Sequence, residues 1–256
     1  MTNPIRYIGR KTTGFLSELG EIARLLAKTY SFIPRIGKDR ALLVKQMEHI
    51  GSDSIPLVLV IGFFTGMVSS WQAAYQFKGM ISNSFIGSAV SRAIFIELGP
   101  VLAAIVIAGR VGASIAAELG TMKVTEQIDA LESLGISPIR YLSTPRVVAA
   151  TLMMPLLTIF ANMIALIGAF VVANFFLDIS NKVFFDSVKR YFHVKDILGG
   201  IFKSLFFGNV LALIGVHVGL KTSGGAEGVG LSSIRAFVLG ASMILILDYL
   251  LWMVIF

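Results

Sequence analysis

Charged side chains inside long apolar runs are the residues of this sequence best able to do chemistry. Glu97 and Lys203 are the clearest cases, and Asp248 lies in the apolar stretch ILILDYLLWMVIF near the end of the sequence. An ionisable side chain at the centre of a membrane helix costs roughly 2.5–3.5 kcal/mol, so it usually faces a bundle interior, a cavity or a partner charge. Arg92 lies near the expected outer end of its helix, where its long side chain can snorkel to the interface.

Two interpretations of Glu97 and Lys203 follow. Either they pair or flank a polar headgroup beside a substrate cavity, or they form a buried ion pair that only fixes helix register. Pro100 is expected to bend or loosen the helix beside Glu97, because proline leaves a backbone carbonyl without its donor. Three further candidates at the outer end of an earlier helix line the same cavity or form an interfacial belt: Trp71, Gln72 and Tyr75.

A second group of ionisable residues interrupts the apolar sequence with TMKVTEQIDALESLGISP, residues 121–138. On a helix its carboxylates form an acidic stripe and its apolar side chains a stripe on another face, namely Glu126, Asp129 and Glu132 against Ile128, Leu131 and Leu134. Thr125 suits the N-cap of a helix over about 126–134, and Gly135 suits its C-terminal end. The pattern predicts a short helix held by its own bundle or by a partner groove, although an ordinary loop helix has the same signals.

Motifs of common enzymes and cofactor sites do not occur in the sequence. There is no GxxxxGK[ST] loop for a nucleotide and no HExxH, and the three histidines have no ligand spacing. The glycine-rich GGAEGVG, residues 224–230, is better explained as a flexible turn. Cysteine is absent, which excludes disulfides and thiolate metal sites. We therefore expect neither catalysis nor a cofactor or metal in this chain.

Composition predicts the elements that carry these residues. Hydrophobic residues make up 55% of the 256 residues and charged residues 14%, against about 25% charged in a typical soluble domain. The uncharged runs are too long for a soluble helical protein, since about 20 apolar residues cross a bilayer as a helix. We predict an all-α integral membrane protein whose domain, residues 54–256, has five transmembrane helices over about 54–77, 84–110, 146–177, 197–220 and 234–255.

The N-terminal segment, residues 1–53, holds nine Lys/Arg and has apolar residues at helical spacing. This pattern predicts an amphipathic helix at the membrane surface, or a solvated helix packed on protein. With the N-terminus inside, fifteen Lys/Arg fall on the inner side of the predicted spans and five on the outer side. The bias favours a cytoplasmic N-terminus and an outside C-terminus, so the net charge of +7 reports membrane orientation rather than nucleic-acid binding.

Small residues four apart predict close packing of the spans. Gly62 and Gly66 form a GxxxG pair in the first predicted span, and Gly215 and Gly219 form another in the fourth. Such pairs let helices approach closely in lipid. There is no convincing internal repeat, so the inverted-repeat architecture of many secondary transporters has no support.

The block ELGPVLAAIVIAGRVGASIAAELGTMKVTEQIDALESLGISPIRYLSTPRVVA, residues 97–149, strongly resembles the MlaE/YrbE permease family. Members are membrane subunits of ABC transporters that work with MCE-domain proteins. The resemblance implies a five-span permease with an N-terminal interfacial helix. Two copies of the permease are expected to form a homodimer on two copies of a separate ATPase, which binds the ATP. The resemblance also implies an outward cavity carrying lipid to or from a periplasmic MCE protein, in the bacterial inner membrane, with a cytoplasmic N-terminus and a periplasmic C-terminus.

Residue by residue, the resemblance implies a cytoplasmic coupling helix, about residues 122–134, that docks on the ATPase through Glu126, Gln127, Asp129, Ala130, Glu132 and Ser133. The family's charged positions match Glu97, Lys203, Arg235 and Asp248. We expect Arg92, Arg235 and Asp248 to be charges within the membrane. One departure is Ile96, where relatives can have arginine. The implied function is phospholipid transport between the inner membrane and the MCE protein; a non-transporting scaffold and a proton-coupled carrier are the alternatives.

Overall fold

The computed structural model describes residues 4–78 and 85–256. Every regular element within these two stretches is a helix, and five helical segments are long and apolar enough to cross a membrane. They are Arg40–Phe77, Ile86–Val124, Ile139–Phe176, Val194–Leu220 and Gly225–Ile255. The prediction of an all-α membrane protein with five spans is confirmed.

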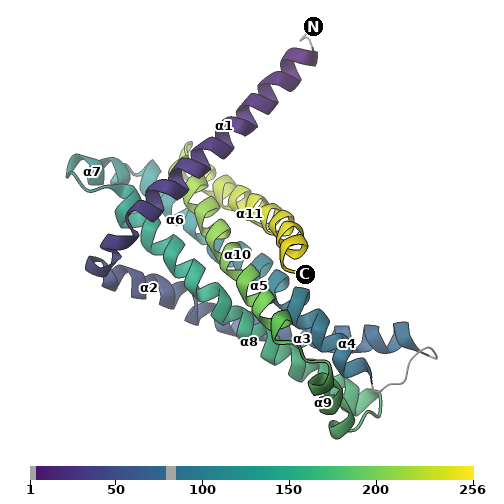
Figure 1. Cartoon of the computed structure of the whole chain (residues 1–256). Coiled ribbons are helices and arrows are strands. Elements are labelled where there is room, and N and C mark those ends of the chain that lie inside the picture. Colours follow the sequence, from purple (N-terminus) through teal and green to yellow (C-terminus); the bar gives the residue numbers. More distant parts are fainter. Residues whose placement is uncertain (1–3, 79–84) are drawn as a thin grey trace.

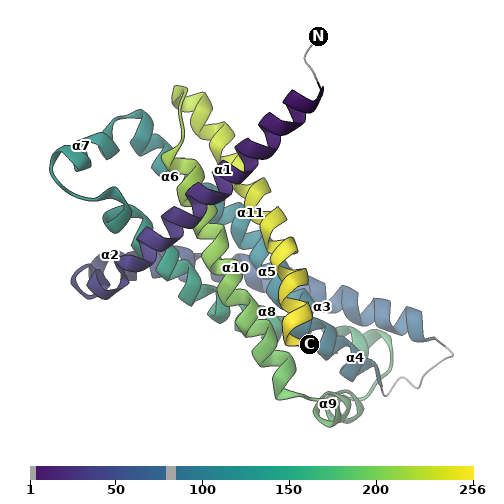
Figure 2. The same ribbon diagram turned by 45° about the horizontal axis from the view of Figure 1, so that its top comes forward.

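The chain enters the first span through a long amphipathic helix, α1 (Pro4–Ser31), which crosses α8 and α10 on the outside of the bundle (Figures 1 and 2). A 3₁₀ turn, η1 (Ile33–Lys38), and α2 (Arg40–Ile50) follow. The turn η2 (Ser52–Ser54) then leads into α3 (Ile55–Phe77). Helical structure continuous with the first span therefore begins before residue 54.

The second span is a helix interrupted by two wide, π-helical turns. Its parts are α4 (Ile86–Ala93), η4 (Ile94–Leu98), α5 (Gly99–Ile107), η5 (Ala108–Gly112) and α6 (Ala113–Val124). It runs past the predicted end at residue 110, and the charges near its C-terminal end have partners in other helices. Arg110 donates to the Ser54 hydroxyl at 2.5 Å, and Glu118 pairs with Arg146 at 2.6 Å.

The second half of the chain contributes the remaining spans and two short helices at opposite ends of the bundle (Figure 1). α7 (Gln127–Ser133) and η6 (Ile139–Ser143) precede α8 (Thr144–Phe176), and α9 (Asn181–Arg190) lies between α8 and α10 (Val194–Leu220). The last span is α11 (Gly225–Ile255). The sequence patterns did not predict α9, which is held by the fully buried Phe184.

Glycines set the closest helix contacts, as the GxxxG pairs predicted. A Cβ at Gly66 of α3 would fall on the Ala165 carbonyl of α8, and one at Gly62 would meet Ile164. The second pair, in α10, faces α6 and η5 in the same way, with Gly215 against the Gly112 carbonyl. The prediction of close packing at both pairs is confirmed, and it fixes where α3, α8 and α10 can lie.

Gly66→Ala is expected to destabilise the protein by about 1–3 kcal/mol, because the new methyl group forces α3 away from the Ala165 carbonyl. The thermal unfolding midpoint of the purified protein in detergent measures the loss. Gly230→Ala is the matched control, since nothing lies within 4 Å of a Cβ there. Equal midpoints for the two variants would contradict the tight α3–α8 contact.

Candidate functional site

Lys203 is completely buried and lies between two carboxylates. Its Nζ donates a hydrogen bond to Glu97 Oε1 at 2.9 Å, and Asp248 Oδ1 lies 2.6 Å from the same nitrogen. Nζ also donates to the backbone carbonyl of Ile96 at 3.2 Å. The three charged side chains come from η4, α10 and α11, so a single ammonium group joins the second, fourth and fifth spans. We call Glu97, Lys203 and Asp248 the charged cluster.

The backbone before Pro100 explains why Lys203 reaches Ile96. Proline has no N–H, so the carbonyl four residues earlier, that of Ile96, loses its usual helical donor. The helix widens into η4 at this point, and Lys203 supplies the missing donor. α10 can come this close because Gly200 has no side chain to collide with the Phe95 carbonyl. The prediction that Pro100 loosens the second span is confirmed.

The three side chains of the charged cluster differ in their exposure to solvent. The exposed fraction of the side chain rises from 0% at Lys203 through 19% at Asp248 to 35% at Glu97. With both carboxylates ionised the cluster carries one net negative charge, and its attractions are strong because little water screens them. A carboxylate only accepts hydrogen bonds, so the Glu97 edge can receive a cationic or hydrogen-bond-donating group of a ligand.

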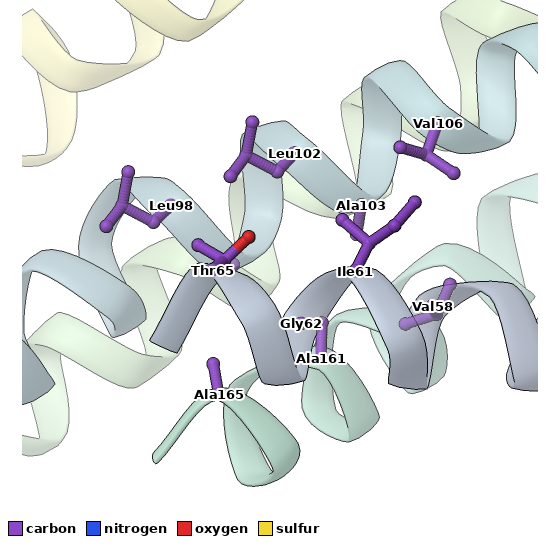
Figure 3. A pocket seen from close by; sticks show the side chains of 11 residues that line it. Val58, Ile61, Gly62, Thr65, Leu98, Leu102, Ala103, Val106, Ala161 and Ala165 are labelled. Atoms are coloured by element: carbon purple, nitrogen blue, oxygen red, sulfur yellow. The ribbon is translucent and has the colours of Figure 1, made fainter. Parts of the chain in front are cut away.

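A narrow apolar crevice lies on the second span beside α3 and α8. It lies between α3, α5 and α8, and Figure 3 shows Ile61 and Thr65 of α3 close to Leu98 and Leu102 of the second span. Leu98 directly follows Glu97 in the chain. Among the described residues that line the crevice, only Thr65 has a polar side chain. Its free volume is about 10 Å³, the space of a single water molecule, so a hydrocarbon chain enters only if α3 and the second span separate.

The aromatic candidates of the first span lie apart from the charged cluster. Trp71 makes an edge-to-face contact with Phe176 of α8 at a ring-centroid distance of 5.8 Å, and Tyr75 is 79% exposed. Gln72 is exposed between them. No contact described for the charged cluster involves these three side chains, so only a ligand or a second chain can bring them into one site.

The other intramembrane charges anchor the two ends of the bundle. Arg92 donates to Asp196 Oδ2 at 2.9 Å, at the start of α10, and does not stand alone at the interface. Arg235 donates to Glu18 Oε1 of α1 at 2.7 Å. Of the predicted intramembrane charges Arg92, Arg235 and Asp248, only Asp248 contacts Lys203. Sequence reasoning missed Asp196 and Glu18; the signal for Asp196 was its place just before the fourth predicted span, since Arg92 lies near the start of the second.

The start of α7 differs from its prediction. Thr125 was expected to cap this helix, but its hydroxyl donates to the Thr121 carbonyl at 2.7 Å and so completes α6. Glu126 takes the N-cap position in the left-handed region, with φ of 60°. The predicted C-terminal end is confirmed: Gly135 has φ of 73°, and its N–H donates to the Glu132 carbonyl at 2.9 Å.

The apolar stripe of α7 is buried at one end and exposed at the other. Ile128 is 4% exposed and packs into the main core, while Leu134 is 74% exposed. All six residues of the predicted docking face are exposed, namely Glu126, Gln127, Asp129, Ala130, Glu132 and Ser133. Asp129 is paired with Lys123 at 2.7 Å. In the described part of the chain, Glu126 and Glu132 have no ion-pair partner, and their carboxylates are available to another protein.

Polar contacts tie the segment after α7 to the N-terminal helices. Arg140 makes a two-pronged bond to Asp39, with its Nε and Nη2 each 3.1 Å from Asp39 Oδ2. The buried hydroxyls of Thr29 and Ser143 are 2.9 Å apart. These contacts join the segment between α7 and α8 to the end of α1 and to the start of α2.

Comparisons with known proteins give this arrangement a family. The family described as Permease MlaE matches residues 43–254. A probable ABC transporter permease protein of Rickettsia felis is 36% identical over 98% of this chain and 97% of its own length. The chain belongs to the MlaE permease family. It is thus a multi-pass membrane permease, as the resemblance of residues 97–149 predicted.

Two further MlaE relatives widen the range of organisms. The probable ABC transporter permease protein slr1045 of Synechocystis is 41% identical over 83% of this chain and 81% of its own length. The protein trigalactosyldiacylglycerol 1, chloroplastic, of Arabidopsis thaliana is 38% identical over 81% of this chain and 59% of its own length. Both matches extend beyond the block from which the MlaE resemblance was first drawn.

Proposed function

We propose that this MlaE permease carries phospholipids or related lipids through a homodimer, driven by a separate ATPase and working with a periplasmic MCE-domain protein. The observation that carries the lipid assignment is the accessible carboxylate of Glu97, which lies within a bundle of five long apolar spans. A lipid needs both surfaces, because its headgroup is polar and its chains are not. The name of the Arabidopsis relative refers to a galactolipid, which agrees with this substrate class.

The ATPase partner is supported by the names of the relatives and by α7. The sequence has no nucleotide-binding loop of its own, so ATP hydrolysis belongs to another chain. Closure of the partner ATPases would push α7, and the contacts of Arg140 and Ser143 would pass that movement to α1 and α8. The resulting shift of the spans would squeeze the outward cavity of the homodimer and displace the lipid. We place α7 and the N-terminus in the cytoplasm and the C-terminus in the periplasm of a bacterial inner membrane.

Reversing the two unpaired charges of α7 is expected to weaken ATPase binding. Glu126→Lys with Glu132→Lys should lower the affinity for the partner ATPase at least tenfold in pull-down titrations, because like charges replace complementary ones. Asp129→Lys alone should cost less, since Asp129 is already paired with Lys123. Unchanged affinity in the double variant would remove the acidic stripe from the docking surface.

The lipid assignment is tested by what copurifies. The assembled transporter, purified with its ATPase in detergent, is expected to retain glycerophospholipid detectable by mass spectrometry, and less after Glu97→Ala. Recovery of a small water-soluble solute in place of lipid would overturn the lipid assignment. Movement that persists without ATP would instead favour the proton-coupled carrier, and retained lipid movement after Glu97→Ala and Lys203→Ala would favour a scaffold.

A further inference from the structure

A second apolar groove lies on the outside of the bundle, separate from the crevice between α3, α5 and α8. It has a volume of about 630 Å³ and runs between α1 and α10, with one residue each from α8 and α11. Ala23 and Ala27 form its α1 wall, opposite Phe202 and Phe206 of α10. The groove is open because Ala23 and Ala27, which lie four residues apart on the same face of α1, have small side chains. Larger side chains at these two positions would fill the space.

A polar group sits inside this apolar groove. The Asn209 side-chain amide donates to the Tyr30 hydroxyl at 2.7 Å and to Thr151 Oγ1 at 3.2 Å, which uses both of its hydrogens. The Thr151 hydroxyl in turn donates to the Val147 carbonyl. Within the described chain, the Tyr30 hydroxyl hydrogen has no acceptor and the Asn209 carbonyl oxygen has no donor. One hydrogen-bond donor and one acceptor therefore face the groove unused.

With the N-terminus in the cytoplasm, as proposed above, the groove lies at the depth of the inner half of the membrane. Asn209 is six residues from Lys203 toward the inner end of α10, about 9 Å along the helix axis. α1 borders the groove, and its exposed basic residues Arg24 and Lys28, which have no ion pair within the described residues, lie one position beyond the two groove-lining alanines. No acidic residue lines the groove. Hydrocarbon leaves the Tyr30 and Asn209 groups unsatisfied, at a cost that a bound polar group removes.

We infer that this groove binds a glycerophospholipid of the inner leaflet. An acyl chain occupies the apolar wall of Phe202 and Phe206, an ester carbonyl accepts from the Tyr30 hydroxyl, and the phosphate lies near Arg24 and Lys28. Each part of such a lipid meets a suitable part of the groove: the acyl chain meets aromatic rings, the ester meets a hydroxyl, and the phosphate meets two cations. This site is independent of the transported substrate, since it lies on the outer surface of the bundle and not at Glu97.

Photolabelling in nanodiscs tests the site. The probe is phosphatidylglycerol with a diazirine in one acyl chain, added to the full-length protein in phosphatidylethanolamine discs, and labelled peptides are mapped by mass spectrometry. Labelling is expected to concentrate in residues 23–30 and 202–210. Ala27→Trp fills the groove and should reduce that labelling at least tenfold, whereas Ala41→Trp, on the exposed face of α2, should leave it unchanged.

A second variant keeps the test valid if tryptophan disturbs the fold. Tyr30→Phe removes one hydroxyl and keeps the ring, so labelling should fall about fivefold, the effect of one hydrogen bond. Uniform labelling of all lipid-facing helices, or labelling that neither variant changes, would overturn the proposal in favour of unspecific annular lipid.

Because the described chain has no cysteine, a single Ala27→Cys variant introduces one thiol at the groove for crosslinking. A disulfide between two copies, without lipid labelling, would show instead that a second copy covers the groove.

Discussion

Lys203→Met is expected to destabilise the protein by about 3–5 kcal/mol and to abolish transport. Methionine has nearly the length of lysine but no charge, so the Glu97 and Asp248 carboxylates would lose the ammonium group that compensates both of them. Removing one partner of a buried ion pair costs this much because the remaining charge is left uncompensated. The Ile96 carbonyl would also lose its donor beside Pro100. Thermal unfolding of the purified protein and ATP-driven lipid movement in proteoliposomes measure the two effects.

A neutral triple variant separates the two roles that the sequence left open. Lys203→Met combined with Glu97→Gln and Asp248→Asn removes all three charges together, and most of the stability is expected to return. If the cluster only fixes helix register, transport returns as well. If Glu97 receives a lipid headgroup, transport stays low while the unfolding midpoint recovers. We expect the second result, because Glu97 is the accessible edge of the cluster.

Ile128→Ala is expected to release α7 from the bundle. Ile128 is the buried side chain of this seven-residue helix, and truncating an isoleucine in a core costs about 2–5 kcal/mol. Amide hydrogen exchange over residues 127–133 should speed up at least thirtyfold, which corresponds to about 2 kcal/mol. The spans should keep their protection, since their contacts do not pass through Ile128. Lipid movement driven by the partner ATPase should be lost, although the ATPase itself still hydrolyses ATP.

Leu134→Ala is the matched control for Ile128. Leu134 belongs to the same apolar stripe but is 74% exposed, so exchange over α7 should not change. A weaker ATPase affinity in this control, with normal exchange, would place Leu134 on the docking surface beside the acidic stripe. Equal exchange in Ile128→Ala and in the unmodified protein would show that α7 is held by something other than its buried isoleucine.

Turns and helix ends show where local sequence was sufficient. Gly135 was predicted to end α7 because glycine adopts positive φ without strain, and that preference does not depend on distant residues. Thr125 was equally local but failed, since its hydroxyl had two competing backbone partners and the carbonyl of Thr121 took it. The second span was predicted too short for a related reason: the partners of Arg110 and Glu118, Ser54 and Arg146, lie in other helices.

The sequence by itself determined the number of spans, the break before Pro100 and the close-packing glycines. A helix satisfies its own backbone in lipid, so its place along the chain depends only on local hydrophobicity. Only the tertiary structure decided which charges meet. Glu97 and Lys203 are separated by 106 positions, and their contact exists because α10 approaches η4 at Gly200, where a side chain would hold the helices apart. Asp248 lies 2.6 Å from the same Lys203 nitrogen, a three-charge arrangement that no spacing in the sequence encodes.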